Sequence, residues 1–386
     1  MTNWQEVRLG DVCDLIAGFA FKSKDFGDYP DKVIKITNIE PPFVNMTNLS
    51  GIDISKYDKN KLEKFIVQKG DYVLAMTGAT IGKLGRVYSN WAYINQRVLL
   101  FKSNTKADKN FLYYILADYN FSQYVINHVD SESAQANISA TTIGKYEFSL
   151  PLLEIQKKIA AVLGALDDKI ELNNKINTNL EQQMYTLVEQ DILNIETKIS
   201  LDELCNVFTG RKNANEFEKN GKNKFFTCGP DALTINSFIY DGPAIIVSGN
   251  GAYTGRTRFY NGKFDLYQRT YACTIKENIK SDYIYILYPI LKLQLEKKLM
   301  GGTHGSAIPY IVMNDIAKFQ VPFNEPVFNK IVPMCKAMID KIQANESENE
   351  KLSQFRDTLL PKLMSGEIDV SKVDILNSNL LFREDA

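Results

Sequence analysis

The chain repeats itself, and this repeat limits its possible folds more than any other feature. One pattern occurs twice, about 172 residues apart, as Ile170-x2-Asn173-x3-Asn177-x2-Leu180 and as Ile342-x2-Asn345-x3-Asn349-x2-Leu352. The motifs before this pattern also follow the same order in both halves. Such self-similarity indicates a duplicated structural unit. We therefore expect two similar modules, held apart by a spacer, that bind two similar targets.

The length of the chain agrees with two domains. Its 386 residues, of which 45% are hydrophobic and 24% charged, suffice to bury two ordinary cores. No segment approaches the roughly 18 to 20 consecutive apolar residues that a membrane span needs. Residues 1–4 also lack the basic and apolar regions of a signal peptide. We expect a soluble, cytoplasmic protein.

The cysteines give no sign of a disulfide framework or a zinc site. There are five of them, and they are Cys13, Cys205, Cys228, Cys273 and Cys335. They are widely scattered, with only two histidines to help them, whereas such sites need closely spaced ligands. Cys13 and Cys205 occupy matching repeat positions, which indicates buried core. We expect no metal and no cofactor.

Each half begins with a short apolar helix that runs into a glycine turn, at residues 9–18 and 201–210. Alternating strand segments follow at 33–36, 71–76 and 243–247. Buried helices are expected at 111–116 and 283–287, and last strands at 148–151 and 319–322. The first copy is about 20 residues longer near its start. The order of elements predicts an α+β protein with two similar, β-rich domains, whose recognition surfaces need not be identical.

A glycine-rich loop ends one strand in each half, at residues 77–86 and 248–256. Its backbone amides and cations can approach phosphate oxygens closely. A plain hairpin turn is an equally weighted alternative. The loop is followed by Asn95-Gln96-Arg97 in the first half and by Tyr267-Gln268-Arg269 in the second. Gln can pair twice with adenine and Arg twice with guanine in the major groove, although both can also bridge strands within a domain.

Three motifs resemble catalytic or nucleotide sites only superficially. Gly78-x3-Gly82-Lys83-Leu84 has one residue too few for a phosphate loop, and Leu stands where Ser or Thr would hold magnesium. Glu40-Pro41-Pro42-Phe43 resembles an adenine methyltransferase tetrad, but Glu replaces its Asn or Asp, so we interpret it as a rigid turn. The Gly301–Ser306 loop lacks a third group to orient His304, and residues 131–135 take its place in the first half without a histidine. A polar loop that reaches bases or phosphates fits both halves better.

Long helices are predicted after each last strand, at roughly 154–193 and 332–360, with Pro333 in a first turn. Their apolar stripes have heptad spacing, and Asn interrupts both stripes at the same two places. Asn in a seam fixes register, so the two helices should pair with each other. The pairing residues would be Ile170, Asn173, Asn177, Leu180, Ile342, Asn345, Asn349 and Leu352. The alternative is an amphipathic helix that packs on its own domain.

A helix of about 35 residues is about 52 Å long, more than one turn of DNA at about 34 Å, so such a pair can act as a spacer. The acidic residues Asp167, Asp168, Glu346, Glu348 and Glu350 lie on these helices. We expect them to form solvated faces. The net charge of −1 does not decide whether the partner is a polyanion, because such acids can mask basic loops elsewhere.

Two segments resemble the specificity subunit of type I restriction-modification systems. They are Leu150-Pro-Leu-Leu-Glu-Ile-Gln156-Lys-Lys-Ile159, with Leu163-x2-Leu166-Asp-x2-Ile170, and the tail Phe355-Arg-Asp-Thr-Leu-Leu-Pro361-Lys-Leu-Met-Ser-Gly366-Glu-Ile368. Together with the repeat, the resemblance covers essentially the whole chain. It departs from the pattern where Asn324, Glu325, Pro326 and Val327 replace the Glu-x-Gln of the first copy, so the two docking surfaces can differ.

The resemblance implies two target recognition domains, each reading one half of a split DNA sequence. These would be residues 1–152 and 196–323, with a central helix at 153–195 and a distal helix and tail at 324–386. The long antiparallel helices would act as a spacer and as the docking site for methyltransferase subunits. We expect two such subunits. Those subunits would bind the methyl donor and methylate adenine, and separate restriction subunits would hydrolyse ATP, translocate DNA and cut it.

We therefore predict a non-enzymatic subunit that binds double-stranded DNA. The residues expected to contact DNA are Lys22, Lys24, Thr77, Thr80, Lys83, Arg86, Asn95, Gln96, Arg97, Gln135, Arg211, Lys212, Asn250, Tyr253, Arg256, Tyr267, Gln268, Arg269, Thr303, His304 and Ser306. Loop Lys and Arg would position phosphates, and Gln, Asn and Arg would read bases. The rival hypotheses are a methyltransferase or nuclease with its own active site, and a coiled-coil adaptor that binds only proteins.

Overall fold

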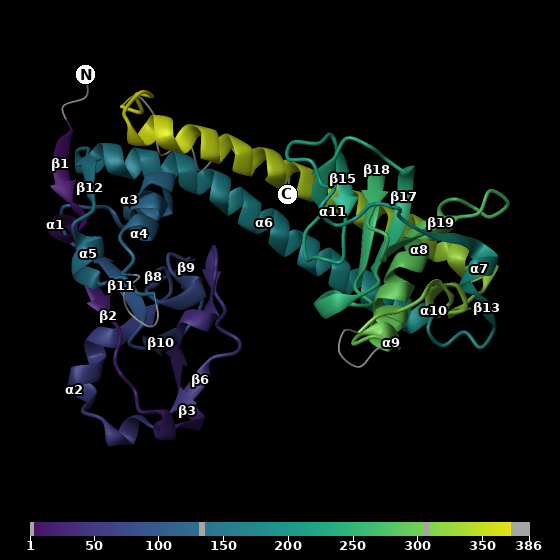
Figure 1. The fold of residues 1–386 in the computed structure, drawn as a ribbon, viewed down its shortest axis with the longest axis horizontal. Coiled ribbons are helices and arrows are strands. Elements are labelled where there is room, and N and C mark those ends of the chain that lie inside the picture. The colour runs from purple at the N-terminus through teal and green to yellow at the C-terminus, as the bar shows by residue number, and fades with distance from the viewer. Residues whose placement is uncertain (1–3, 131–135, 305–308, 372–386) are drawn as a thin grey trace. The chain divides into compact units, whose positions relative to one another are not determined.

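The computed structural model describes residues 4–130, 136–304 and 309–371 (Figure 1). The chain divides into two compact units, residues 1–170 with 350–386 and residues 171–349. Each unit contains one of the two β-rich domains that the repeat predicts, and part of each copy of the repeated helix pattern lies in the second unit. Within the described residues, no helix is both long and apolar enough to cross a membrane.

The first unit contains two sheets and a short strand pair. The larger sheet has the order β2-β11-β8-β9-β5-β4, the smaller sheet β6-β3-β10-β7, and β1 pairs with β12. These strands are β1 (Gln5–Arg8), β2 (Cys13–Ala17), β3 (Phe26–Ile34), β4 (Ile39–Glu40), β5 (Phe43–Val44), β6 (Ser50–Ile52), β7 (Ile66–Gln68), β8 (Tyr72–Ala75), β9 (Leu84–Arg86), β10 (Trp91–Ile94), β11 (Val98–Ser103) and β12 (Glu147–Leu150).

Short helices connect and cover these strands. They are α1 (Leu9–Val12), η1 (Ser23–Asp25), η2 (Ile36–Asn38), η3 (Ile54–Lys56), α2 (Lys59–Leu62), η4 (Glu63–Phe65), η5 (Gly78–Thr80), α3 (Lys109–Ala117), α4 (Tyr119–Asn127) and α5 (Ala140–Gly144). Asp108 caps α3, because its carboxylate accepts the backbone N–H groups of Asn110 and Phe111 at 3.0 Å each. The buried face of α3 packs with Leu9, Leu74 and other residues of the main core of this unit.

The second unit is built around one sheet with the order β14-β19-β17-β18-β15-β16. Its strands are β13 (Lys198–Ser200), β14 (Cys205–Thr209), β15 (Asn223–Phe226), β16 (Leu233–Ile235), β17 (Tyr240–Ser248), β18 (Thr257–Leu266), β19 (Thr270–Ile275) and β20 (Gln320–Pro322). Its short helices are α7 (Leu201–Leu204), η6 (Gly251–Tyr253), α8 (Tyr283–Ile290), the π-helical turn η7 (Leu291–Leu295), α9 (Glu296–Leu299) and α10 (Met313–Ala317). β13 and β20 form a separate two-stranded sheet.

Two glycines lie opposite each other in the long β17–β18 hairpin. Gly242 and Gly262 form one cross-strand pair, and their φ angles are 138° and 139°. A side chain would strain the backbone there, so glycine permits both strands to depart from regular geometry at one level. The end of β18 beyond this point pairs with β15, and the chain then turns back into β19 beside β17.

The sequence prediction of strands and cores holds, with one change near each start. Cys13 and Cys205 are buried at 1% exposure each. The segments 9–18 and 201–210 are not helices that run into a turn, since α1 and α7 contain four residues each and continue into β2 and β14. Glu40–Phe43 forms the turn between the short paired strands β4 and β5, as interpreted from the sequence.

The two long helices are α6 (Leu153–Asp191) and α11 (Glu325–Met364). The predicted start of α11 is wrong, because Pro333 lies in the helix interior rather than in its first turn. The helix begins earlier since Asn324 caps it: its side-chain oxygen accepts the N–H of Val327 at 3.1 Å. The early turns then bury Phe328, which offsets the backbone hydrogen bond lost at the proline.

The two helices pack together, as predicted. In the second unit, Asn173 donates to Asn349 at 2.9 Å and Asn345 donates to Asn177 at 2.7 Å. Four residues forward on α6 correspond to four residues back on α11, so the helices are antiparallel. Ile342 is 8% exposed, and Leu180 is half-buried. Ile170 and Leu352, at the border of the two units, are also half-buried.

The expectation that all the helix acids are solvated is wrong for Asp167 and Glu348. In the first unit, Asp167 accepts from Arg356 and from the hydroxyl of Tyr114, at 2.7 Å in both cases. The side chain of Asp167 is only 24% exposed. In the second unit, Glu348 accepts from Asn173 at 2.8 Å. Both carboxylates therefore help to join α6 to α11.

Candidate nucleic-acid interface

Loops from separate parts of the second unit meet in one place. We call residues 211–213, 249–256, 267–269, 303–304 and 309–310 the second loop cluster. The N–H of Gln268 donates to Lys212 O at 2.9 Å, and the N–H of Gly249 donates to Arg269 O at 2.8 Å. The N–H of Gly251 donates to Pro309 O at 3.1 Å. Backbone hydrogen bonds thus hold the glycine loop, the Gln-Arg turn and the late loop side by side.

The first unit has a corresponding set, residues 76–83, 95–97 and 136–138, which we call the first loop cluster. The N–H of Met76 donates to Arg97 O at 2.9 Å, and the N–H of Gly78 donates to Ala136 O at 3.0 Å. The N–H of Ile138 returns to Met76 O at 3.0 Å. The same three segments of the repeat are therefore joined by the same kind of contact.

The two clusters share one backbone scaffold. Gly78 and Gly251 open their loops with φ angles of 68° and 78°, which glycine adopts without strain. The carbonyls of Lys83 and Arg256 accept from the strands before the loops, both at 3.0 Å. Lys83 and Arg256 therefore occupy equivalent positions in the two units. The Gln-Arg turns follow at matching places, so both units present a cation and a Gln-Arg pair from equivalent positions.

Several predicted residues are exposed on these clusters. In the first cluster they are Lys83, Gln96 and Arg97, and in the second Arg211, Tyr253, Gln268, Arg269, Thr303 and His304. The guanidinium of Arg97 donates to Asn137 at 3.2 Å, while the Gln268 amide makes only a long contact of 3.4 Å to Asn213. The Arg256 guanidinium lies 5.5 Å from the ring centre of Tyr253. Exposed groups such as the side-chain amides of Gln96 and Gln268 can form hydrogen bonds with a ligand.

Other predicted residues support the loops instead. Thr77 is 4% exposed, and its hydroxyl donates to Ala136 O at 3.0 Å. Thr80 donates back to Thr77 O at 3.0 Å. Asn95 accepts the backbone N–H of Gln96 at 3.0 Å, which fixes the Gln-Arg turn.

In the second cluster, half-buried Asn250, Tyr267 and Lys212 connect the loops. Asn250 and Tyr267 form β-bridges to Tyr310 and Lys212, and Lys212 pairs with Glu216 at 3.4 Å. Gln135 and Ser306 lie outside the described residues. A matching β-bridge, Thr77 with Asn137 in the first unit and Asn250 with Tyr310 in the second, joins the glycine loop to the late loop in both units.

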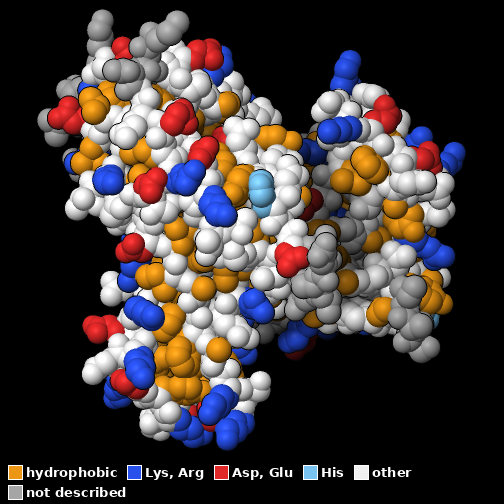
Figure 2. Space-filling view, turned by 60° about the vertical axis from the view of Figure 1, so that its left-hand side comes forward, with side chains coloured by type: hydrophobic (Ala, Val, Ile, Leu, Met, Phe, Trp, Pro, Cys, Tyr) orange, Lys and Arg blue, Asp and Glu red, His pale blue; other side chains and the backbone are white. Residues whose placement is uncertain are grey.

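Three predicted cations lie away from the first cluster. Arg86 faces Tyr72 across β8 and β9 and lines a pocket of about 410 Å³ with Asp167. Lys22 and Lys24 are exposed near Tyr57, whose hydroxyl accepts the N–H of Lys22 at 3.0 Å. They belong to the part of the first unit around α2 and β3, where Lys and Arg side chains gather (Figure 2). We call this part the basic tip, although Asp25, Asp53 and Asp58 pair with some of its lysines.

The expectation that no third group orients His304 is wrong, because His304 lies beside Asp315 and anchors its loop there. Its Nε2 lies 3.5 Å from the carboxylate of Asp315, and its ring stacks on Tyr310 with centres 5.3 Å apart. The hydroxyl of Thr303 donates to the same carboxylate at 2.7 Å. Burial raises the pKa of Asp315, but hydrogen bonds from Val312 N–H and Thr303 outweigh it, so the net shift is downward. An ionised Asp315 holds this loop to α10.

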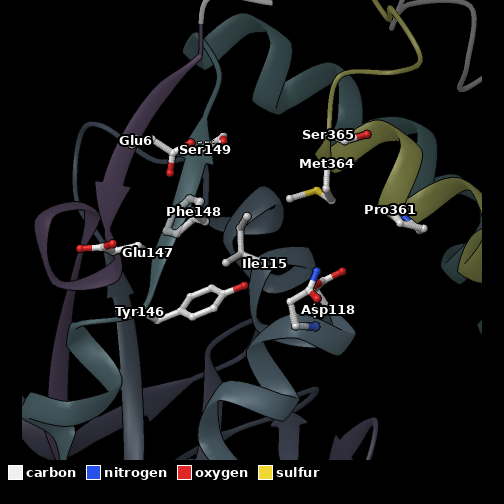
Figure 3. A pocket seen from close by; sticks show the side chains of 11 residues that line it. Glu6, Ile115, Asp118, Tyr146, Glu147, Phe148, Ser149, Pro361, Met364 and Ser365 are labelled. Carbon is white, nitrogen blue, oxygen red and sulfur yellow. Dashed lines mark hydrogen bonds between the residues drawn. The ribbon is translucent and has the colours of Figure 1, made fainter.

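A pocket of the first unit shows different chemistry (Figure 3). It has a volume of about 410 Å³ and is lined by Glu6, Asp118 and Glu147, together with Met364 and Ser365 at the end of α11. In Figure 3 the carboxylate of Glu6 meets the hydroxyl of Ser149. No residue of the first loop cluster lines it. Its carboxylates would repel phosphates, so it is not a candidate DNA surface.

No metal-binding group stands out in the described part of the chain, where no three His, Cys, Asp or Glu side chains lie close enough to share an ion. The buried thiols are also unreactive in character. Burial raises the pKa of Cys13, Cys205 and Cys335 to about 12. They therefore remain protonated near neutral pH.

Comparisons with known proteins agree with this arrangement. A family model described as the type I restriction modification DNA specificity domain matches residues 1–182 and again residues 195–353. The chain is 23% identical over 425 aligned positions to the type I restriction enzyme MjaIX specificity subunit of Methanocaldococcus jannaschii, covering 96% of this chain and 95% of that protein. It is 31% identical over 175 residues to the EcoDI specificity subunit of Escherichia coli, covering 44% of this chain and 38% of that protein.

The fold has a solved counterpart. The crystal structure of a type I restriction-modification system S subunit from M. genitalium superposes with a TM-score of 0.58 and 17% identity, covering 94% of this chain and 96% of the other. At this identity the likeness shows the fold alone. The family match, which covers both copies of the repeat, shows the function. The chain belongs to the type I restriction-modification DNA specificity family and is a non-catalytic specificity subunit.

Proposed function

We propose that each loop cluster reads one half of a split sequence in double-stranded DNA. The supporting observation is that one backbone scaffold occurs twice and presents an exposed Gln-Arg pair both times. Gln96 and Arg97 would read one half-site, and Gln268 and Arg269 the other, from the major groove. Lys83, Arg256 and the basic tip with Lys22 and Lys24 would contact phosphates, which position the protein without reading sequence.

The partners in this proposal are modification subunits, two per chain, and restriction subunits in the complete complex. The modification subunits would bind the methyl donor and methylate adenine, and the restriction subunits would cut. The paired helices α6 and α11 would set the distance between the half-sites and dock the modification subunits. A complex that acts on the cell's own DNA would work in the cytoplasm.

The test is to co-express the chain with its modification subunits and map methylated adenines across a genome. We expect one split motif with a constant spacer. Purified chain alone should neither methylate nor cut DNA. A motif without a gap, or methylation by the chain alone, would contradict the proposal, and a complex indifferent to DNA sequence would favour a protein-only adaptor.

The Gln-Arg pair is tested by replacing Gln268 and Arg269 together with Ala. Loss of two bidentate contacts removes about 1–3 kcal/mol of discrimination for each, so recognition should change or fail at one half-site only. The matched control is the double variant Q96A/R97A, which should affect the other half-site. Methylation mapping measures both. Equal loss at both half-sites in either variant would refute the assignment of one cluster to each half.

A further inference from the structure

A half-buried arginine of the second unit lies close in sequence to the second loop cluster. Arg258 is on β18, two residues after Arg256. Its Nη2 donates to Thr227 O at 3.0 Å, and its Nη1 reaches the carbonyls of Gly229 and Pro230, both at 3.4 Å. A single guanidinium is thus the hydrogen-bond donor to three carbonyls of one loop, residues 227–231.

Arg258 has no carboxylate partner within the described residues, although it lies beside a second cation. Burial and the neighbouring Arg256 lower the pKa of Arg258 to about 10, while Cys228 and Asp231 oppose the shift. Its Nε is buried without a hydrogen-bond partner. Burying a charge costs free energy unless other groups compensate it. Here the compensating groups are the loop carbonyls and the ring of Phe226, whose centre lies 5.2 Å from the guanidinium.

The 227–231 loop is joined to the residues proposed to read DNA. The thiol of Cys228 donates to Arg269 O at 3.1 Å, and the guanidinium of Arg256 donates to Pro230 O at 2.9 Å. The loop is also closed internally, since Gly229 N–H donates to the hydroxyl of Thr227 at 3.1 Å. Pro230 and Asp231 at its tip are exposed. The loop therefore flanks both Arg269 and Arg256.

Among its described residues, the first unit has no arginine at the position equivalent to Arg258. The register that matches Lys83 with Arg256 places Gly85 at the position of Arg258. A Cβ atom on Gly85 would lie 2.9 Å from Phe43 O, because β5 pairs with β9 there. In the first unit β5 thus lies close beside Gly85, whereas in the second unit the side chain of Arg258 holds the 227–231 loop, which follows β15.

On this basis, and resting on the function proposed above, we propose that residues 227–231 form an additional DNA-contacting loop of the second unit, and that Arg258 is the residue that positions it. Contact with the half-site read by Gln268 and Arg269 would cover Cys228. The other four cysteines are buried at no more than 1% exposure, so Cys228 is the accessible thiol of the chain. It can report on the loop directly.

The first experiment measures alkylation of Cys228 by N-ethylmaleimide in the complex with modification subunits, by mass spectrometry of its peptide. We expect duplex DNA carrying the mapped target to slow alkylation several-fold, and unrelated duplex of equal length not to do so. Equal rates with saturating target DNA would overturn the proposal. If the complex methylates a split motif while Cys228 is unprotected, only this inference fails, whereas absence of a split motif refutes the proposed function itself.

The second experiment replaces Arg258. R258M keeps much of the side-chain volume but cannot hold the three carbonyls, and R258K keeps the charge without the planar fork. We expect R258M to relax or alter the sequence preference at one half-site only, with R258K intermediate. K263M, on the same strand, is the control and should keep the parental motif. A parental motif in a folded R258M complex would refute the positioning role, and equal changes at both half-sites would refute it as well.

Discussion

Gln156 connects the start of α6 to the loop before α3. Its side-chain oxygen accepts Asp108 N–H at 2.8 Å, and its amide donates to Lys106 O at 3.1 Å and Pro151 O at 2.8 Å. The residue is 1% exposed. One repeat later the position is Phe328, also buried, which packs on Tyr283 with ring centres 5.4 Å apart. The Glu-x-Gln difference between the copies thus changes an internal anchor from polar to apolar.

Replacing Gln156 with Ala should destabilise the first unit by about 1–3 kcal/mol, because three backbone groups, bonded to Gln156 in one buried and two part-buried hydrogen bonds, lose their partner. Urea denaturation of the purified chain measures the effect. Gln183, exposed on the same helix, is the matched control, and Q183A should change stability by less than about 0.5 kcal/mol. Equal effects of the two substitutions would contradict this role of Gln156.

Glu181 is a half-buried acid in the second unit. Burial raises the pKa of Glu181 above its ordinary value of 4.5, and the nearby Lys292 opposes this shift only in part. Because the folded pKa exceeds the unfolded one, the folded state binds the proton more tightly. Folding stability therefore falls as pH rises through the interval from the unfolded pKa to the folded pKa.

Replacement of Glu181 with Gln removes the ionisable group. We expect E181Q to unfold at a higher temperature than the parent chain near pH 7, and the difference to vanish below about pH 4, where the carboxyl is protonated in both states. Thermal melts at the two pH values measure this. E189Q, an exposed position on the same helix, should shift stability by less than about 0.5 kcal/mol. A lower melting temperature for E181Q at neutral pH would contradict the direction.

At the scale of elements, asparagines of the two repeat copies form hydrogen bonds with each other across the helix pair. Asn173 of the first copy meets Asn349 of the second, and Asn345 of the second meets Asn177 of the first. Asn173 and Asn345 are both 1% exposed. Such pairs satisfy each other in one register only, so they select that register over a slipped one. The ion pair between Asp167 and Arg356 has no counterpart one repeat away. The matching positions there are Ile339 and Met184, both buried and apolar.

N345A should destabilise the second unit by about 1–3 kcal/mol, since Asn177 then loses its donor inside the helix pair. Replacing both residues, in N177L/N345L, should cost less than the single change because no unpaired polar group remains. A double-mutant cycle in urea measures the coupling. Additive effects of N177L and N345L would show that the two asparagines do not act as a pair.

At the scale of the molecule, the proposed role of α6 and α11 as a spacer can be tested by lengthening both. Four residues inserted after Leu180 and four before Ile342 keep the asparagine register, because the helices are antiparallel. The insertion adds about 6 Å, roughly two base pairs at about 3.4 Å each. We expect the spacer of the methylated motif to lengthen accordingly. An unchanged spacer would refute the role, and a four-residue insertion after Asn220 in a surface turn serves as control.

Much of the architecture followed from the sequence because repetition and periodicity are local signals. The 172-residue repeat predicted two similar units, and heptad spacing with matched asparagines predicted the pairing of α6 with α11. The Gln-Arg turns were located by their place after a glycine loop, and they are exposed in both units. These features depend on residues close together in the chain or repeated along it.

Other features were decided only when distant segments met. Thr77 and Arg86 belong to the same glycine loop as Lys83 in sequence, yet one closes the loop from inside and the other faces Tyr72. Asp167 became an internal partner of Arg356, 189 residues away. Arg258 gave no sequence signal, because its carbonyl partners lie 28 to 31 residues earlier, in a loop without a motif. Burial and long-range partners depend on how strands and helices pack, which residue spacing does not encode.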